Sequence, residues 1–91
     1  MFSDTLEPYL FKARIERFTE GVDRNNNPIY HYQINTAAGY VEKANKPKKF
    51  KTEEQAVAEL HNFAAAHNMK FAQKIRVEIT LINGQTISMG G

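Results

Sequence analysis

Few side chains in this chain are of a type that supports catalysis. The histidines are His31, His61 and His67, and there is no cysteine. His61 and His67 lie six positions apart, about 240° around a helix, so they cannot hold one metal ion together. The neighbouring carboxylates Glu53 and Glu54 point in different directions, and helix capping explains them. There is also no glycine-rich phosphate motif. We therefore expect a protein that is not an enzyme and has no cofactor or metal.

Binding chemistry is concentrated in one basic segment. Five of the twelve Lys and Arg residues fall within nine positions, and they are Lys43, Lys46, Lys48, Lys49 and Lys51. Without them, seven basic residues face ten acidic ones, so the formal charge changes from +2 to −3. Such a patch attracts phosphates or acidic surfaces within a Debye length of ~8–10 Å. The segment is either an electrostatic clamp or a solvated loop that Pro47 and mutual repulsion keep extended.

A helix must follow this basic segment. Residues 52–55, Thr-Glu-Glu-Gln, form a capping box, and the two acids suit the positive end of the helix dipole. Spacings of one, three and four then define an apolar stripe, made of Ala56, Val57, Leu60, Phe63, Ala64 and His67. We expect the helix to end near Asn68, because asparagine tolerates the left-handed conformation at a C-terminus.

Strands are predicted before the helix. Residues 8–19 alternate in polarity, with Phe11, Ala13 and Ile15 on one face. Residues 29–36 alternate again after a polar loop, so the two segments form a hairpin. A weaker third strand begins at Tyr40 and ends near Phe50.

A second hairpin is predicted after the helix. Residues 75–81 alternate, Asn83-Gly84 is a strong hairpin signal, and residues 85–89 return. A two-residue turn would place Ile87 and Met89 on the polar face. Either a bulge shifts the register by one and returns Ile87 to the core, or an apolar patch stays outside.

Together these elements predict one α+β domain over residues 1–91. Its antiparallel sheet has four to five strands with one helix packed on one face, in the order β-β-(β)-α-β-β. The other face stays in water. It is predicted to carry polar residues, namely Lys12, Arg14, Glu16, His31, Gln33, Asn35, Arg76, Glu78 and Thr80.

The start of the chain has no basic or apolar run typical of a signal peptide. No stretch approaches ~18 apolar residues, so no membrane span is expected. These features favour a cytoplasmic protein.

One short run resembles a known family. Residues 49–60, with Lys-Phe-Lys-Thr at their start and Ala56 and Leu60 after it, resemble the end of the arm-type DNA-binding domain of phage integrases. That domain has three strands and a helix, and its sheet face enters the major groove. The resemblance implies that the basic segment holds phosphates and that five side chains face bases, namely Lys12, Arg14, His31, Gln33 and Asn35. The chain differs in its nearly balanced charge, in Glu16 and Glu78 on that face, and in two further strands.

The first functional hypothesis is a small binding protein that occupies a surface of a larger protein or ribonucleoprotein. In size and lack of motifs the chain is similar to small accessory proteins of phages and mobile elements, which include the anti-CRISPR inhibitors. The predicted partner-binding residues are Lys43, Lys46, Lys48, Lys49, Lys51, Lys12, Arg14, His31, Gln33, Arg76, Ile87 and Met89. The alternative is nucleic-acid binding through the basic segment and the polar face. A homodimer formed through Ile87 is a third hypothesis.

Overall fold

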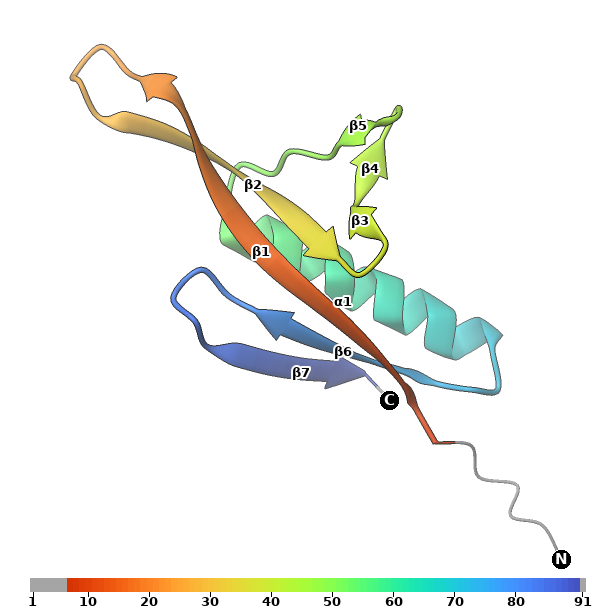
Figure 1. Ribbon diagram of the computed structural model, residues 1–91. Coiled ribbons are helices and arrows are strands. Elements are labelled where there is room, and N and C mark those ends of the chain that lie inside the picture. The colour runs from red at the N-terminus through yellow and green to blue at the C-terminus, as the bar shows by residue number, and fades with distance from the viewer. Residues whose placement is uncertain (1–6, 91) are drawn as a thin grey trace, which may run out of the picture.

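A computed structural model describes residues 7–90 of the chain (Figure 1). One helix, α1 (Glu53–Lys70), lies across one face of a five-stranded sheet (Figure 1). The predicted α+β class is therefore confirmed. The prediction of no signal peptide concerns residues that lie mostly outside the described range.

The strands follow the predicted order. They are β1 (Tyr9–Val22), β2 (Pro28–Thr36), β3 (Gly39–Tyr40), β4 (Glu42–Lys43), β5 (Lys46–Pro47), β6 (Ile75–Thr80) and β7 (Thr86–Gly90). The sheet order is β3-β2-β1-β6-β7, and β4 pairs with β5 in a separate small hairpin. The sheet is mostly antiparallel, but β1 and β6 are parallel. This departure from the prediction arises because α1 carries the chain back across the sheet before β6 begins, as parallel neighbours require.

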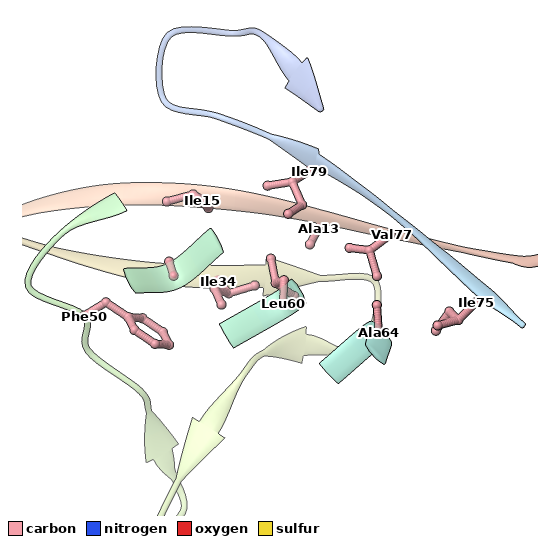
Figure 2. Close-up of a cluster of buried hydrophobic side chains, with 10 residues drawn as sticks. Ala13, Ile15, Ile34, Phe50, Leu60, Ala64, Ile75, Val77 and Ile79 are labelled. Carbon is pink, nitrogen blue, oxygen red and sulfur yellow. The ribbon is translucent and has the colours of Figure 1, made fainter. Parts of the chain in front are cut away.

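The core lies between α1 and the sheet, as the alternation in β1 predicts. Ala13 and Ile15 of β1 are buried, and so are Ile34 of β2 and the apolar residues of β6, Ile75, Val77 and Ile79. Figure 2 shows these side chains gathered with those of the helix and with Phe50. The helix contributes Ala56, Leu60 and Ala64. Because two of these three are alanines, the helix backbone can lie close to the sheet.

The helix begins as predicted and ends two residues later than predicted. The Thr52 hydroxyl accepts a hydrogen bond from the Gln55 amide at 3.1 Å, and the Gln55 side chain accepts one from the Lys51 amide. Asn68 does not terminate the helix. Its side chain instead accepts from the Ile75 amide at 2.6 Å and donates to the Ile75 carbonyl at 3.1 Å, which fixes the start of β6 to the helix.

The last hairpin adopts the shifted register. Ile87 pairs with Ile79 and Met89 with Val77, so both side chains pack against the core. The Leu81 amide donates to the Gln85 carbonyl, which leaves a loop of three residues rather than two. Gly84 has φ +89°, the left-handed residue that a three-residue hairpin loop needs. The alternative of an outer apolar patch is therefore wrong.

The predicted third strand is broken into pieces. β3 is only two residues long, the β4–β5 hairpin follows it, and Phe50 then forms a bridge with Tyr32 in β2. Ala44 and Asn45 form the turn of the β4–β5 hairpin with φ of 55° and 66°. Two consecutive positive φ values are typical of a tight type I′ turn, which favours Asn-Gly over Ala-Asn.

Ala44 is therefore in an unfavourable backbone conformation, and Ala44→Asn is expected to stabilise the hairpin. A left-handed conformation costs an alanine roughly 1–2 kcal/mol, and asparagine tolerates it better. We expect urea unfolding to show a gain of ~0.5–1 kcal/mol. Ala44→Val is the matched control and should lower stability, because β-branched residues fit positive φ poorly. Equal effects of the two substitutions would contradict this conformation.

Candidate binding surfaces

The structure divides the basic segment between two sides of the molecule. Lys48 Nζ lies 2.9 Å from Glu59 Oε2 on the helix side. Lys49 Nζ lies 3.4 Å from Glu20 Oε1, on the open face of the sheet. Neighbouring residues of an extended segment point to opposite faces, so one lysine accompanies the buried Phe50 side chain and the other opposes it. The five lysines therefore do not form one continuous clamp.

The other lysines of the segment are exposed and form no ion pair within residues 7–90. Lys43 and Lys46 are direct cross-strand neighbours in the β4–β5 hairpin, and Lys51 lies just before the helix cap. Like charges opposite each other destabilise a hairpin. Glu42 is also exposed in β4, so two lysines and one glutamate give this hairpin a net charge of +1; it stands away from the main sheet in Figure 1.

The uncovered face of the sheet carries the predicted polar residues. The β1–β2 register places Arg14, Glu16 and their partners Asn35 and Gln33 on it. The β1–β6 register adds Lys12 and its neighbours from β6, Arg76, Glu78 and Thr80. No described helix covers this face (Figure 1). The sequence therefore placed these polar residues on the open face correctly, but the same registers also put Leu10 and Phe18 there, which it did not predict.

The side-chain amides of Asn35 and Gln33 on this face contact neighbouring side chains. Asn35 Nδ2 donates to Glu16 Oε2 at 3.1 Å, and the Tyr40 hydroxyl donates to Glu16 Oε1 at 2.5 Å. Gln33 Nε2 and His31 Nε2 are 3.0 Å apart. Gln33 and Asn35 would have to give up these contacts to read a base edge. The resemblance to the integrase domain therefore loses two of its five implied base contacts in this conformation.

Hydrogen bonds from Tyr40 and then Asn35 lower the pKa of Glu16 below its usual value of 4.5. The same contact with Glu16 raises the pKa of the Tyr40 hydroxyl. A lowered folded-state pKa means that Glu16 stabilises the fold above about pH 4.5 and loses this effect as the pH falls through the folded value.

Glu16→Gln is therefore expected to reduce stability at neutral pH and to matter less in acid. Thermal unfolding between about pH 3 and 7 should show the gap between wild type and variant closing below pH 4.5. Tyr40→Phe removes the hydrogen bond that lowers the pKa of Glu16 most. In that background, Glu16→Gln should therefore reduce the thermal stability by less than it does in the wild type. A gap that stays constant over this range would disprove the charged network.

The His31 side chain is largely covered by its neighbours on the sheet. Its ring stacks on Phe18 at 5.3 Å with an interplanar angle of 16°. Its Nδ1 atom lies 2.9 Å from Glu20 Oε1, although not in hydrogen-bond geometry. Glu20 has no partner in β2 at the register shift of β1, and its carboxylate lies near both His31 and Lys49. With its side chain 13% exposed, His31 offers little surface to a partner.

Three cations on the open face are exposed and unpaired within the described range, namely Lys12, Arg14 and Arg76. Lys12 lies opposite Glu78 in the β1–β6 register, yet the two groups form no ion pair. Glu7 and Glu78 lie beside Arg76 on the same part of the face, so three cations against two carboxylates leave it a net charge of only +1.

A groove that the sequence did not predict lies between α1 and the chain around β3. It has a volume of about 450 Å³ and is mostly apolar, with Phe11, Val41, Glu59, Leu60, Asn62 and Phe63 lining it. Phe63 was predicted in the apolar stripe of the helix, but it is 43% exposed. Its ring lies 5.3 Å from that of Phe11. Only the three-dimensional arrangement reveals this groove, because Phe11, Leu60 and Phe63 each fit an ordinary core pattern in the sequence.

A second hollow, of about 280 Å³, adjoins the edge of β1. Residues 9–12 line one side of it, and Thr36, Ala37 and Ala38 at the end of β2 line the other. The hollow exists because β2 ends at Thr36, opposite Ala13, and no other described strand pairs with the earlier residues of β1 on this edge. Phe11 lines both the hollow and the groove.

Ile87 and Met89 are half-buried and face the helix side, so they do not form an exposed patch on the open face. Within residues 7–90, no three His, Asp or Glu side chains come together as metal ligands. The described helix is not long and apolar enough to cross a membrane.

Comparisons with protein-family models, curated proteins and solved structures find no match to this chain.

Proposed function

We propose that this protein is a non-enzymatic binding module that occupies a surface of a larger protein or ribonucleoprotein. The main support for this proposal is the apolar groove beside α1, where Phe11 and Phe63 stay in contact with solvent. Exposed aromatic side chains in a groove are typical anchors of protein interfaces. Action by occupying a partner's surface is also the mode of the accessory and inhibitor proteins that the chain is similar to in type.

Charge supports the same proposal. Exposed cations lie on two separate surfaces, the open face of the sheet and the β4–β5 hairpin, and each group contributes a local positive field. Such a field speeds encounter with an acidic partner and fixes its orientation more than it adds affinity. The lysines therefore steer the partner, and the groove contributes the specificity.

Affinity capture with the full chain, with and without nuclease treatment, tests this function. We expect a stoichiometric protein partner that stays bound after nuclease treatment. The Phe63→Ser variant should retain at least tenfold less of this partner than the wild type does. Met69→Ser is the matched control, since Met69 is 88% exposed on the same helix and does not line the groove. Absence of a stoichiometric partner, or equal effects of both substitutions, would contradict the proposal.

Nucleic-acid binding is the second candidate, and the pairing of Lys43 with Lys46 favours it, because phosphate would relieve their repulsion. Useful binding commonly takes ~6–10 phosphate contacts. The free cations of the hairpin and of the open face number five, and they lie on different surfaces. This count makes nucleic acid the weaker candidate.

A salt titration with duplex DNA separates the two candidates. Direct binding would weaken steeply with salt, and the slope would fall after Lys43→Ala and Lys46→Ala. Lys48→Ala is the matched control, because Glu59 already neutralises that lysine. Lack of binding at low salt would eliminate this candidate.

A further inference from the structure

Among the residues that the structure describes, none pairs with one backbone edge of Tyr9–Lys12, the first four residues of β1. The Tyr9 amide donates to the Lys74 carbonyl on the β6 side, at 2.8 Å. Successive residues of a strand direct their N–H and C=O groups to opposite edges, so those of Leu10 and Lys12 point away from β6. On that edge β2 has already ended, and the hollow lies there. The backbone groups of Leu10 and Lys12 are thus available to another strand.

The two faces of a strand added at this edge would meet different surroundings. On the helix side, Phe11 leads directly into the apolar groove with Leu60 and Phe63. On the open face, the edge presents the exposed side chains of Leu10 and Lys12, and Arg76 and Glu78 lie behind them in β6. Because strand side chains alternate between faces, one face of the added strand should be apolar and the other acidic.

We propose that the Tyr9–Lys12 edge binds an extended segment of a partner protein as an added β-strand. Its apolar side chains enter the groove and its acidic side chains lie beside the cations of the open face. This inference rests on the proposed function only in that the partner is a protein. Main-chain hydrogen bonds then supply affinity, and the alternating side chains supply specificity.

A second copy of this chain is a poorer occupant than an acidic segment. Edge-to-edge pairing of two copies would bring two sets of the same cations, Lys12, Arg14 and Arg76, onto one continuous face. Like charges at such an interface oppose association. The edge is also only four residues long, about 13 Å, which is short for a stable dimer but sufficient for a peptide.

The test uses two synthetic peptides and the full chain in an NMR titration. One peptide is acetyl-Glu-Leu-Glu-Phe-Glu-Leu-Glu-amide, and the other has lysine in place of every glutamate. We expect the acidic peptide to bind at least tenfold more tightly and to shift the amide signals of Leu10, Lys12 and Phe63. Equal binding of the two peptides, or shifts confined to other residues, would overturn the proposal.

Two variants test the site itself. Leu10→Pro removes an N–H that points to the free edge but none that bonds to β6, so the fold should persist and affinity should fall about tenfold. Leu10→Ala is its matched control and keeps the N–H, so it should bind as the wild type does. Lys12→Glu should reverse the preference between the two peptides.

A further measurement covers the outcome in which Leu10→Pro fails to fold. An acidic peptide with N-methyl groups on alternate residues cannot donate to the edge and should bind at least tenfold less tightly than the unmodified peptide. Unchanged binding would overturn strand addition. A partner that is captured equally by wild type and Lys12→Glu would leave the binding function standing and would overturn this site alone.

Discussion

Ile87→Lys is expected to lower the free energy of unfolding by about 2–3 kcal/mol, whereas Ser88→Lys should leave it unchanged or raise it slightly. Ile87 packs against the core opposite Ile79, so a lysine there would lose apolar contact and force its charge outward. Ser88 lies on the open face opposite Glu78, where a lysine gains an acidic cross-strand neighbour.

Urea unfolding of both variants, together with light scattering, measures this difference. The pair reports directly on register, because a shift by one residue exchanges the two faces of a strand. If Ile87→Lys instead leaves stability unchanged and splits a dimer, Ile87 belongs to an interface between copies and the register of the last hairpin is wrong.

Asn68→Ala is expected to destabilise the protein by ~2–3 kcal/mol. The Asn68 side chain satisfies both the N–H and the C=O of Ile75, which would otherwise lose their partners in a partly buried place. Asn68→Asp keeps the acceptor but loses the donor, so the stability that it loses should lie between none and that lost in Asn68→Ala. Asn62→Ala is the matched control on the exposed surface of the same helix and should cost less than 1 kcal/mol, about the effect of an ordinary surface change.

Hydrogen exchange at the Ile75 amide gives a local measurement of the same contact. Protection of this amide should fall in Asn68→Ala and persist in Asn68→Asp, which still provides a carboxylate oxygen. Wild-type protection and stability in Asn68→Ala would show that the helix and β6 are joined by other contacts.

The sequence predicted those elements whose patterns are local. Alternation around Ala13 and Ile15 correctly separated the buried and open faces of β1, and the capping box correctly placed the start of the helix at Thr52. Asn68 misled the prediction of the helix end, because its side chain serves a strand rather than a C-cap. Local pattern cannot distinguish these two uses of an asparagine.

The binding surfaces were less predictable because they depend on which strands become neighbours. Clustering of lysines in sequence did not produce a cluster in space, since Lys48 and Lys49 point to different sides and pair with Glu59 and Glu20. The hollow beside Phe11 depends on where β2 stops relative to β1, and the groove near Phe63 depends on how α1 lies against the chain around β3. No spacing rule within either strand contains that information.

Within residues 7–90, the β1–β2 hairpin and the β6–β7 hairpin meet through the pairing of β1 with β6, and the stretch of β1 that pairs on both edges is brief. Only Ala13 and Arg14 have partners on both edges, Thr36 and Asn35 in β2 and Ile79 and Thr80 in β6. The two hairpins can therefore open separately at their outer ends, as distinct cooperative units, while α1 holds them together at the centre. Joining them also requires a pairing between residues 9 and 75, so closure of this junction should be a late, entropically costly event in folding.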